Sequence, residues 1–157
     1  ASGGVGSFAV QLAKMVGAYV IGTTSEANID FVKSLGADEV INYKTEDFTK
    51  KVKDADVVLS TIHGDTQTKS FRVLRKGGML VSTVQPPDPA LLKQYEVRGW
   101  NGMVSPNGAR LQEIAGLIDA GKIKINIEKT FPLQEAKAAH ELSEKGKVRG
   151  KLVLKIG

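Results

Sequence analysis

The sequence opens with Ala1-Ser2-Gly3-Gly4-Val5-Gly6 (ASGGVG), which runs directly into apolar residues at helical spacing. Those apolar positions are Val5, Phe8, Ala9, Leu12, Ala13 and Val16. Gly3 has no Cβ, so its backbone can approach a bulky anion, and Gly6 allows the helix to lie close to a strand. Free N–H groups and the positive dipole end at a helix N-terminus attract negative charge. The stretch therefore predicts a pyrophosphate-binding turn, with a plain tight loop as the alternative, because Ala1 replaces the first glycine of the strict G-x-G-x-x-G pattern.

Composition limits the kind of protein that the 157 residues can form. The length predicts one domain, or one domain plus a piece of another, and a hydrophobic content of 41% is ample for a core. Apolar runs such as residues 55–59 are too short to span a bilayer. The net charge of +5 is spread along a sequence with only 6% aromatic residues, which argues against nucleic-acid binding. Cysteine is absent and His63 and His140 lie far apart, so we expect no metal site.

Strand-like and helix-like segments alternate after the turn. Strands are predicted at residues 18–24, 38–43, 56–61, 79–84 and 97–103, and helices at residues 25–35, 45–53, 65–75, 90–95 and 109–120. Such alternation is typical of βαβ units, which build an α/β fold with a doubly wound parallel sheet, the Rossmann arrangement. The glycine-rich turn then lies at the first β–α junction, where such sheets bind their ligand. This context favours dinucleotide binding over a plain α/β domain.

The two ends of the sequence suggest a fragment of a longer protein. The turn needs a strand in front of it, and nothing precedes Ala1, so we expect the first strand to be missing. At the other end, a strand at 123–131, a helix at 133–143 and a strand at 151–156 lie beyond the expected six-strand set. We therefore expect two parts: residues 1–122 form the dinucleotide-binding domain without its first strand, and residues 123–157 belong to a partner domain.

Several segments carry a family resemblance. They are ASGGVG at 1–6, VQLAK at 10–14, SLGADEVINY at 34–43, DVVLST at 56–61, KGGMLVS at 76–82, LIDAGKI at 117–123, and FPLQEAKAAHE with GKLVLKI near the end. In this order, over essentially the whole chain, they resemble the medium-chain dehydrogenase/reductase superfamily, in particular its zinc-independent quinone oxidoreductase branch. An alanine at the first glycine position is typical of that branch. The resemblance implies a barrel-like catalytic domain ahead of the first Rossmann strand, to which residues 123–157 return.

The end of the second Rossmann strand bears on the choice of cofactor. An acidic residue there binds the adenosine ribose and repels a 2′-phosphate, whereas this strand ends in Thr23-Thr24-Ser25. Small hydroxyl groups leave room for a phosphate and can donate hydrogen bonds to it. We therefore expect NADPH, with NADH as the alternative. The resemblance adds Tyr43, which matches a tyrosine at the end of the third strand.

One feature of the family pattern is not matched. The resemblance implies a lysine or arginine two or three residues after the serine, where this sequence has Ala27 and Asn28. Glu26 would repel a phosphate if it faced one. Lys44 is the candidate for the missing positive charge.

Strand carboxyl ends line the crevice of such sheets, and this rule, with which the resemblance agrees, places the other contacts. Gly3, Gly4 and Val5 would offer backbone N–H groups to the pyrophosphate. Thr61 and Ile62 would border the ribose after the fourth strand, and Ser82 and Thr83 would border the nicotinamide after the fifth. The complete predicted cofactor-binding set is Ser2, Gly3, Gly4, Val5, Gly6, Thr24, Ser25, Tyr43, Thr61, Ile62, Ser82 and Thr83.

No residue of this sequence is predicted to be catalytic. For His63, after a predicted strand end, we favour a surface loop over a cofactor contact, and His140 lies within a predicted helix. Ser2 lacks the G-x-S-x-G context of a nucleophile. The adjacent carboxylates at 38–39 and 46–47 point in divergent directions and do not form an acid/base pair. A proton donor would come from the missing domain or from water.

The residues and the resemblance together predict an NADPH-dependent oxidoreductase that transfers hydride to a quinone or an α,β-unsaturated carbonyl without a metal. One alternative is a zinc-dependent alcohol dehydrogenase relative whose metal ligands lie in the absent domain. Another is a non-enzymatic dinucleotide-sensing or structural protein. We expect a cytoplasmic protein with a small-molecule substrate and with neither a membrane nor a nucleic acid as partner. The resemblance also implies a homodimer joined through the sixth strand.

Overall fold

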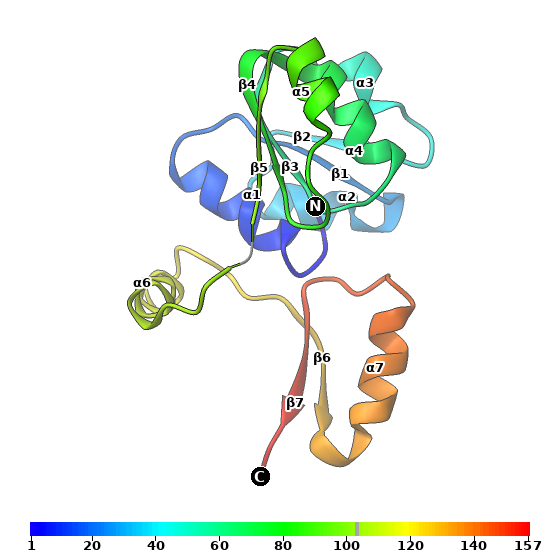
Figure 1. Cartoon of the computed structure of the whole chain (residues 1–157). Coiled ribbons are helices and arrows are strands. Elements are labelled where there is room, and N and C mark those ends of the chain that lie inside the picture. The colour runs from blue at the N-terminus through cyan, green and yellow to red at the C-terminus, as the bar shows by residue number, and fades with distance from the viewer. Residues whose placement is uncertain (103) are drawn as a thin grey trace. The chain divides into compact units, whose positions relative to one another are not determined.

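The computed structural model describes residues 1–102 and 104–157, in which helices and strands alternate (Figure 1). The helices are α1 (Gly6–Met15), α2 (Ile29–Ser34), α3 (Phe48–Lys51), α4 (Asp65–Ser70), α5 (Pro89–Gln94), α6 (Gly108–Asp119) and α7 (Ala136–Glu144). Short 3-10 helices are η1 (Glu26–Asn28), η2 (Phe71–Val73) and η3 (Leu133–Glu135). The strands are β1 (Ile21–Thr24), β2 (Glu39–Asn42), β3 (Ala55–Ser60), β4 (Leu74–Ser82), β5 (Arg98–Asn101), β6 (Ile127–Pro132) and β7 (Lys151–Lys155).

The chain divides into two compact units, one made of residues 1–46 and 107–157 and the other of residues 47–106. The first unit contains the parallel pairs β1–β2 and β6–β7, and the second contains the parallel sheet β3–β4–β5. All strand pairs in the described residues are parallel, which confirms the predicted α/β class. The pair β1–β2 and the sheet β3–β4–β5 have the neighbour relations of strands two–three and four–five–six in the doubly wound order.

The core of the first unit joins α1 and α2 to the β1–β2 pair. Its buried members are Val10, Val32, Leu35 and Ala37, against which half-buried side chains of the strand region pack. Burial of a side chain such as Val32 contributes about 1.5–3 kcal/mol to stability. Gly17 adopts a φ of +79° just after α1, so it is the predicted helix-ending glycine. The helix is thereby aimed with its N-terminus at the carboxyl end of β1.

The second unit has its own core around the central strand β4. Leu80 is completely buried, and it packs with Phe71, Leu74 and Val97. The rings of Phe71 and Tyr95 lie 5.9 Å apart, centroid to centroid. This core holds the carboxyl ends of β3 and β4 beside each other.

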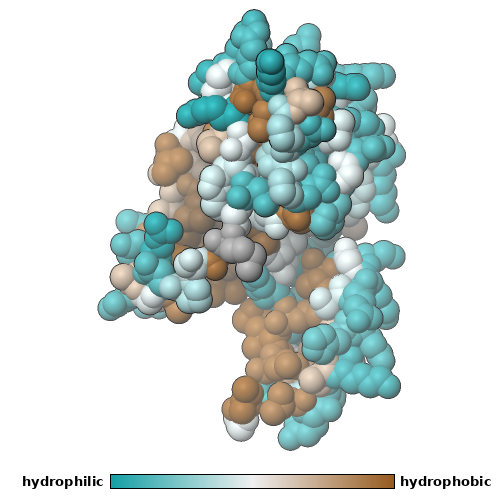
Figure 2. Space-filling model, in the orientation of Figure 1, coloured by the Kyte–Doolittle hydropathy of each residue, from teal (hydrophilic) through white to brown (hydrophobic). Residues whose placement is uncertain are grey.

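The last segment of the first unit is a strand–helix–strand motif, as predicted. Helix α7 packs on the β6–β7 pair, and Phe131 and Ala139 are buried within it (Figure 1). Figure 2 shows apolar surface over this motif, and exposed side chains there include Ile127, Leu154 and Ile156. The motif therefore forms a small core and leaves further apolar residues exposed.

Several predicted helices differ from the structure; the predicted helix 65–75, for example, ends as α4 at Ser70, continues as η2 and gives its last two residues to β4. The predicted helix 25–35 is divided into η1 and α2, because Asn28 has φ −116° and ψ 6°, outside the helical region. The predicted helix 45–53 is reduced to α3, and its N-cap is Asp47, whose carboxylate accepts a hydrogen bond from the Thr49 N–H at 3.0 Å. A carboxylate is a stronger acceptor near a helix N-terminus than a hydroxyl is.

The strand boundaries also shift. Strand β4 begins at Leu74 and passes through Gly77 and Gly78, where the sequence predicts a break between a helix and a strand at 79–84. An irregular register against β3 accommodates the two glycines, and Gly77 has a φ of +73°. The predicted strand 97–103 is β5, and its last predicted residue, Met103, lies outside the described residues.

Helix α6 matches the predicted helix 109–120 within a residue at each end. None of its residues is buried, and Leu111 is 68% exposed.

Candidate functional site

The glycine-rich turn leaves backbone donors free at the start of α1. The N–H of Ser7 donates to the Gly3 carbonyl at 3.0 Å, and that of Ala9 donates to the Val5 carbonyl at 3.0 Å. Within the described part of the chain, the N–H groups of residues 3–6 donate no hydrogen bond, and α1 has no side-chain cap. A Cβ built on Gly3 would meet no atom within 4 Å, so open space lies beside these donors. The turn is therefore suited to an anion such as a pyrophosphate.

The turn approaches β1 closely through two glycines. A Cβ on Gly6 would lie 2.6 Å from the Ala1 carbonyl oxygen, and a Cβ on Gly22 would lie 3.0 Å from the Ala1 Cβ. A larger residue at either position would force the backbone apart. The sequence predicts a close contact between Gly6 and a strand. In the structure Gly6 contacts Ala1, and Ala1 in turn lies against Gly22 of β1.

The C-terminal segment 149–151 lies against the same turn. The N–H of Gly150 donates to the Ser2 carbonyl at 2.9 Å. A Cβ on Gly4 would lie 3.1 Å from the Gly150 carbonyl oxygen and 3.0 Å from the Nζ of Lys151. An open pocket of about 480 Å³ reaches Gly4 and is lined further by residues of α7 and of this segment. The turn therefore has both a nearby cation and space beside it.

Polar side chains meet at the carboxyl end of β1. The Oγ1 of Thr24 donates to the Oγ of Ser2 at 3.0 Å. The Nδ2 of Asn28 donates to the same Ser2 Oγ at 3.2 Å and to the Ser25 Oγ at 3.4 Å. Ser25 makes no capping hydrogen bond to η1, so its hydroxyl oxygen does not accept from the backbone of that helix. The predicted residues Ser2, Thr24 and Ser25 thus form one cluster, which Asn28 joins.

Arg149 reaches this cluster from the far end of the sequence. Its Nε donates to the Oδ1 of Asn28 at 2.9 Å, across a sequence separation of 121 residues, and its Nη2 donates to the Ala27 carbonyl at 3.3 Å. The guanidinium carbon lies 5.3 Å from the centroid of the Phe31 ring. A cation therefore lies at the two positions, Ala27 and Asn28, that lack a basic side chain of their own.

Tyr43 lies beside the same strand end. Its backbone N–H donates to the Thr24 carbonyl at 3.1 Å, which places it next to the polar cluster. Its side chain is 58% exposed and is accessible to a ligand. Lys44 is also exposed, and its backbone N–H binds the Oδ1 of the buried Asn42.

The second unit carries the other predicted residues. Thr83 N–H donates to the Ser60 carbonyl at 3.1 Å, so the ends of β3 and β4 are neighbours. Thr61 is half-buried, whereas Ile62 and Thr83 are exposed. His63 is exposed in the loop after β3, as favoured from the sequence.

Ser82 differs from these neighbours because its hydroxyl is enclosed. The residue is fully buried, and its Oγ accepts hydrogen bonds from Gln67 Nε2 at 2.9 Å, Gln85 N at 3.2 Å and Val84 N at 3.3 Å. Its side chain therefore fixes the loop after β4. Any contact that Ser82 makes with a ligand would come from its backbone.

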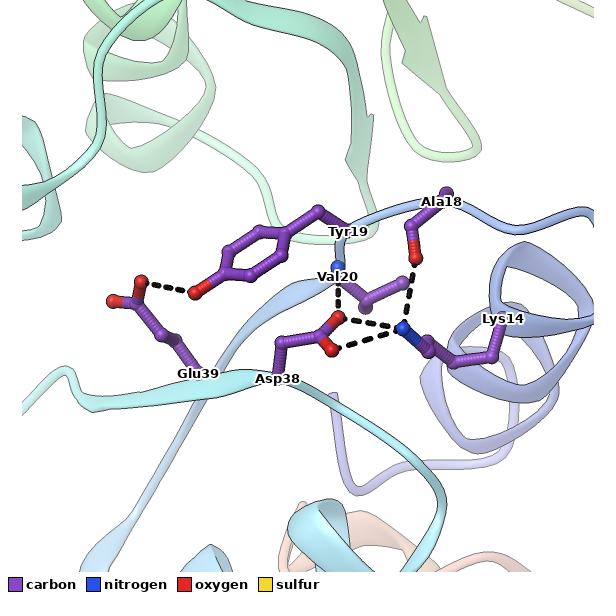
Figure 3. A network of polar contacts seen from close by, with 6 residues as sticks. All are labelled: Lys14, Ala18, Tyr19, Val20, Asp38 and Glu39. Carbon is purple, nitrogen blue, oxygen red and sulfur yellow. Dashed lines mark hydrogen bonds and ion pairs between the residues drawn. The ribbon is translucent and has the colours of Figure 1, made fainter.

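A second polar network lies at the amino ends of β1 and β2 (Figure 3). The carboxylate of Asp38 accepts hydrogen bonds from Lys14 Nζ at 2.8 Å and 2.9 Å and from the Val20 N–H at 2.7 Å. The Lys14 hydrogen bond, followed by that from Val20, holds the pKa of Asp38 below its ordinary value. Tyr19 donates to Glu39 at 2.6 Å, and this bond raises the pKa of the Tyr19 phenol. The network fastens α1 to the two strands and lies at the opposite strand ends from the polar cluster.

In residues 1–102 and 104–157, no three His, Cys, Asp or Glu side chains gather as metal ligands do. None of the described helices has the length and apolarity needed to cross a membrane. The polar cluster at the end of β1, together with the turn, is therefore the candidate site of the first unit.

Residues 35–154 match the family model described as zinc-binding dehydrogenase. The chain belongs to the zinc-binding dehydrogenase family. This membership confirms the predicted resemblance to medium-chain dehydrogenases/reductases of the quinone oxidoreductase type. The solved structures that the chain matches confirm its α/β Rossmann fold.

Three relatives illustrate the match. A probable mitochondrial zinc-binding oxidoreductase of Arthroderma benhamiae is 35% identical over 165 residues, which cover 99% of this chain and 50% of that protein. The quinone oxidoreductase of Coxiella burnetii has a TM-score of 0.93 and 38% identity, over 99% of this chain and 50% of its own. The Escherichia coli quinone oxidoreductase complexed with NADPH has a TM-score of 0.85 and 27% identity, over 99% and 55%. The chain thus spans about half the length of these relatives.

Two residues of the polar cluster were not predicted. Asn28 was considered only as a position that lacks a basic side chain, and Arg149 was not considered at all. The hydroxyls of Thr24 and Ser25 indicate a polar strand end, but no local pattern in the sequence connects Arg149 with that strand end.

Proposed function

We propose that this chain is the dinucleotide-binding part of an NADPH-dependent oxidoreductase that passes hydride to a quinone or an α,β-unsaturated carbonyl without a metal. The observation that carries the proposal is the set of free N–H groups at residues 3–6, with open space in front of Gly3. A diphosphate bridge supplies the negative charge that such a turn attracts. The relatives of this chain include quinone oxidoreductases, which supports the reaction class.

The residues of the turn and the polar cluster fit a dinucleotide. Residues 3–6 would bind the pyrophosphate through their N–H groups, and the Nζ of Lys151 adds positive charge beside Gly4. The hydroxyls of Ser2, Thr24 and Ser25 would bind the adenosine ribose and its substituents. When bound, the nicotinamide ring supplies the hydride, while the protein holds and orients it.

The preference for NADPH is supported by the absence of a carboxylate from the tip of β1. The strand ends in Thr24, and Ser25 follows it, so no acidic side chain at the tip repels a 2′-phosphate. Tyr43 is exposed beside this tip and offers a phenol to the same phosphate. NADH remains the alternative cofactor.

The remaining assignments extend this proposal. In the second unit, Thr61 and Ile62 would border the ribose, and Ser82 and Thr83 would border the nicotinamide, with Ser82 acting through its backbone. We also retain the division into a dinucleotide-binding part, residues 1–122, and a segment of the catalytic domain, residues 123–157. The exposed apolar side chains of β6–β7 support the second assignment, because they suit contact with a further domain.

The proposed enzyme is a cytoplasmic homodimer that acts on a small molecule. The Arthroderma benhamiae relative is named as mitochondrial, so a test of location would include that organelle. The family description names zinc, which makes a zinc-dependent alcohol dehydrogenase relative the second candidate. No catalytic residue is assigned within this chain.

The experiment uses the full-length protein and separates these candidates. Oxidation of NADPH would be followed with a panel of quinones and enones, alongside metal analysis and titration with NADPH and NADH. We expect turnover with no metal and tighter binding of NADPH. Stoichiometric zinc with alcohol oxidation would favour the second candidate. Cofactor binding without turnover would favour a sensor, and absence of any cofactor binding would refute the proposal.

A further inference from the structure

We propose that Arg149 binds the 2′-phosphate of NADPH and is the residue by which this chain distinguishes NADPH from NADH. The inference rests on the proposed function. It assigns to Arg149 the positive charge that Ala27 and Asn28, the residues following the tip of β1, do not supply. A phosphate of nearly two negative charges needs such a partner, and guanidinium is well suited to phosphate oxygens.

The first argument is position. Arg149 is tied to the residues that follow β1, through Asn28 Oδ1 at 2.9 Å and the Ala27 carbonyl at 3.3 Å. Asn28 in turn contacts the hydroxyls of Ser2 and Ser25. In a Rossmann fold, the adenosine ribose lies at the end of this strand. Asn28 is therefore the side chain that links the guanidinium to the hydroxyls that would surround the ribose.

The second argument is charge. Among residues 1–102 and 104–157, no carboxylate forms an ion pair with the Arg149 guanidinium. Glu128 accepts a hydrogen bond from the Arg149 backbone N–H and not from its guanidinium. A guanidinium has five N–H donors, and the two recorded contacts use one at Nε and one at Nη2. The donors on Nη1 remain for a ligand.

The third argument is preorganisation. The Phe31 ring lies 5.3 Å from the guanidinium carbon and supports one face of the plane. The following residue, Gly150, donates its N–H to the Ser2 carbonyl at 2.9 Å, which fixes the backbone of the segment. A side chain held in this way loses little conformational freedom when a phosphate binds.

The other basic residues nearby are less well placed. The recorded contact of Lys44 is made by its backbone N–H, to Asn42. The Nζ of Lys151 lies beside Gly4 and 5.8 Å from the Phe8 ring centroid, at the turn that would hold the pyrophosphate. Lys151 would therefore affect NADPH and NADH alike, whereas Arg149 would affect NADPH alone.

The test measures binding by calorimetry in the full-length protein. The variants are Arg149→Gln, Arg149→Lys and, as a matched control on the same segment, Lys147→Gln, because Lys147 is exposed. The ligands are NADPH, NADH, 2′,5′-ADP and 5′-AMP. For Arg149→Gln we expect at least about tenfold weaker binding of NADPH and 2′,5′-ADP, and less than about twofold change for NADH and 5′-AMP. Arg149→Lys should lie between, and Lys147→Gln should match the wild type.

The outcomes separate this inference from the proposed function. If the wild type prefers NADPH and Arg149→Gln keeps that preference, the inference is wrong and the proposed function stands. If Arg149→Gln weakens the binding of NADPH and NADH equally, Arg149 has a purely structural role and the inference is also wrong. A wild type that binds neither dinucleotide would overturn both. Should Arg149→Gln fail to fold, Arg149→Lys decides: a preference for 2′,5′-ADP over 5′-AMP equal to that of the wild type, at low and high salt alike, would overturn the inference.

Discussion

Replacing Gly3 by alanine separates the binding role of the turn from its structural role. Gly3 has no neighbour within 4 Å of an added Cβ, and its φ lies outside the left-handed region, so alanine fits the folded backbone. Loss of unfolded-state freedom should change stability by about 0.4–1 kcal/mol in the favourable direction. The new methyl group would nevertheless occupy the open space beside the N–H groups of residues 3–6. We expect the affinity for NADPH and for NADH to fall about tenfold or more, which is about 1.4 kcal/mol.

Gly6→Ala and Gly116→Ala provide the contrast. A Cβ at Gly6 would lie 2.6 Å from the Ala1 carbonyl oxygen, so backbone must move, and we expect a loss of about 1–3 kcal/mol in unfolding free energy. Gly116 lies within α6 with nothing within 4 Å of an added Cβ, so alanine there should be neutral or stabilise by up to about 1 kcal/mol.

The assay combines chemical denaturation with fluorescence titration of NADPH and NADH in the full-length protein. The reasoning predicts that Gly3→Ala loses affinity while keeping stability, and that Gly116→Ala keeps both. An unchanged dinucleotide affinity in a folded Gly3→Ala protein would refute the role given to the turn.

Three further predictions concern single side chains. Tyr43→Phe should weaken NADPH binding by about tenfold and leave NADH within about twofold, because the phenol is exposed beside β1; equal effects in titration would contradict it. Asp38 has a pKa held below its ordinary value of 3.8 by Lys14, so it stabilises the fold above that pH and the contribution is lost as the pH falls below it. Asp38→Asn should therefore lower stability at neutral pH and reduce the loss on acidification, seen in urea unfolding across pH 2–7; parallel pH profiles would count against this. Leu80→Ala should cost about 2–5 kcal/mol, since Leu80 is fully buried, whereas the exposed Leu111→Ala should cost less than about 0.5 kcal/mol; similar losses would show that the β4 core is misassigned.

Local sequence determined the parts of the fold that depend on short-range physics. The glycines at the start, the helical spacing after them and the β-rich runs predict α1, β1, β2 and β3 because side-chain size and periodicity act within a few residues. The absence of an acidic residue from the end of β1, where Thr24 and Ser25 stand, is likewise visible in the sequence. Where two local tendencies compete, as at Gly77–Gly78, the sequence predicts a break and the neighbouring strand instead draws the segment into β4.

The tertiary structure alone decided which side chains face the candidate site. Ser82 is at a predicted strand end, yet its hydroxyl is enclosed by Gln67. Asn28 lacks charge, yet it contacts both Ser2 and, across 121 residues, Arg149. Such partners meet only when distant segments fold together, because no local pattern records which residue will fill the space beside another. The sequence by itself therefore determined the glycine-rich turn, and the three-dimensional fold brought Arg149 to the polar cluster beside it.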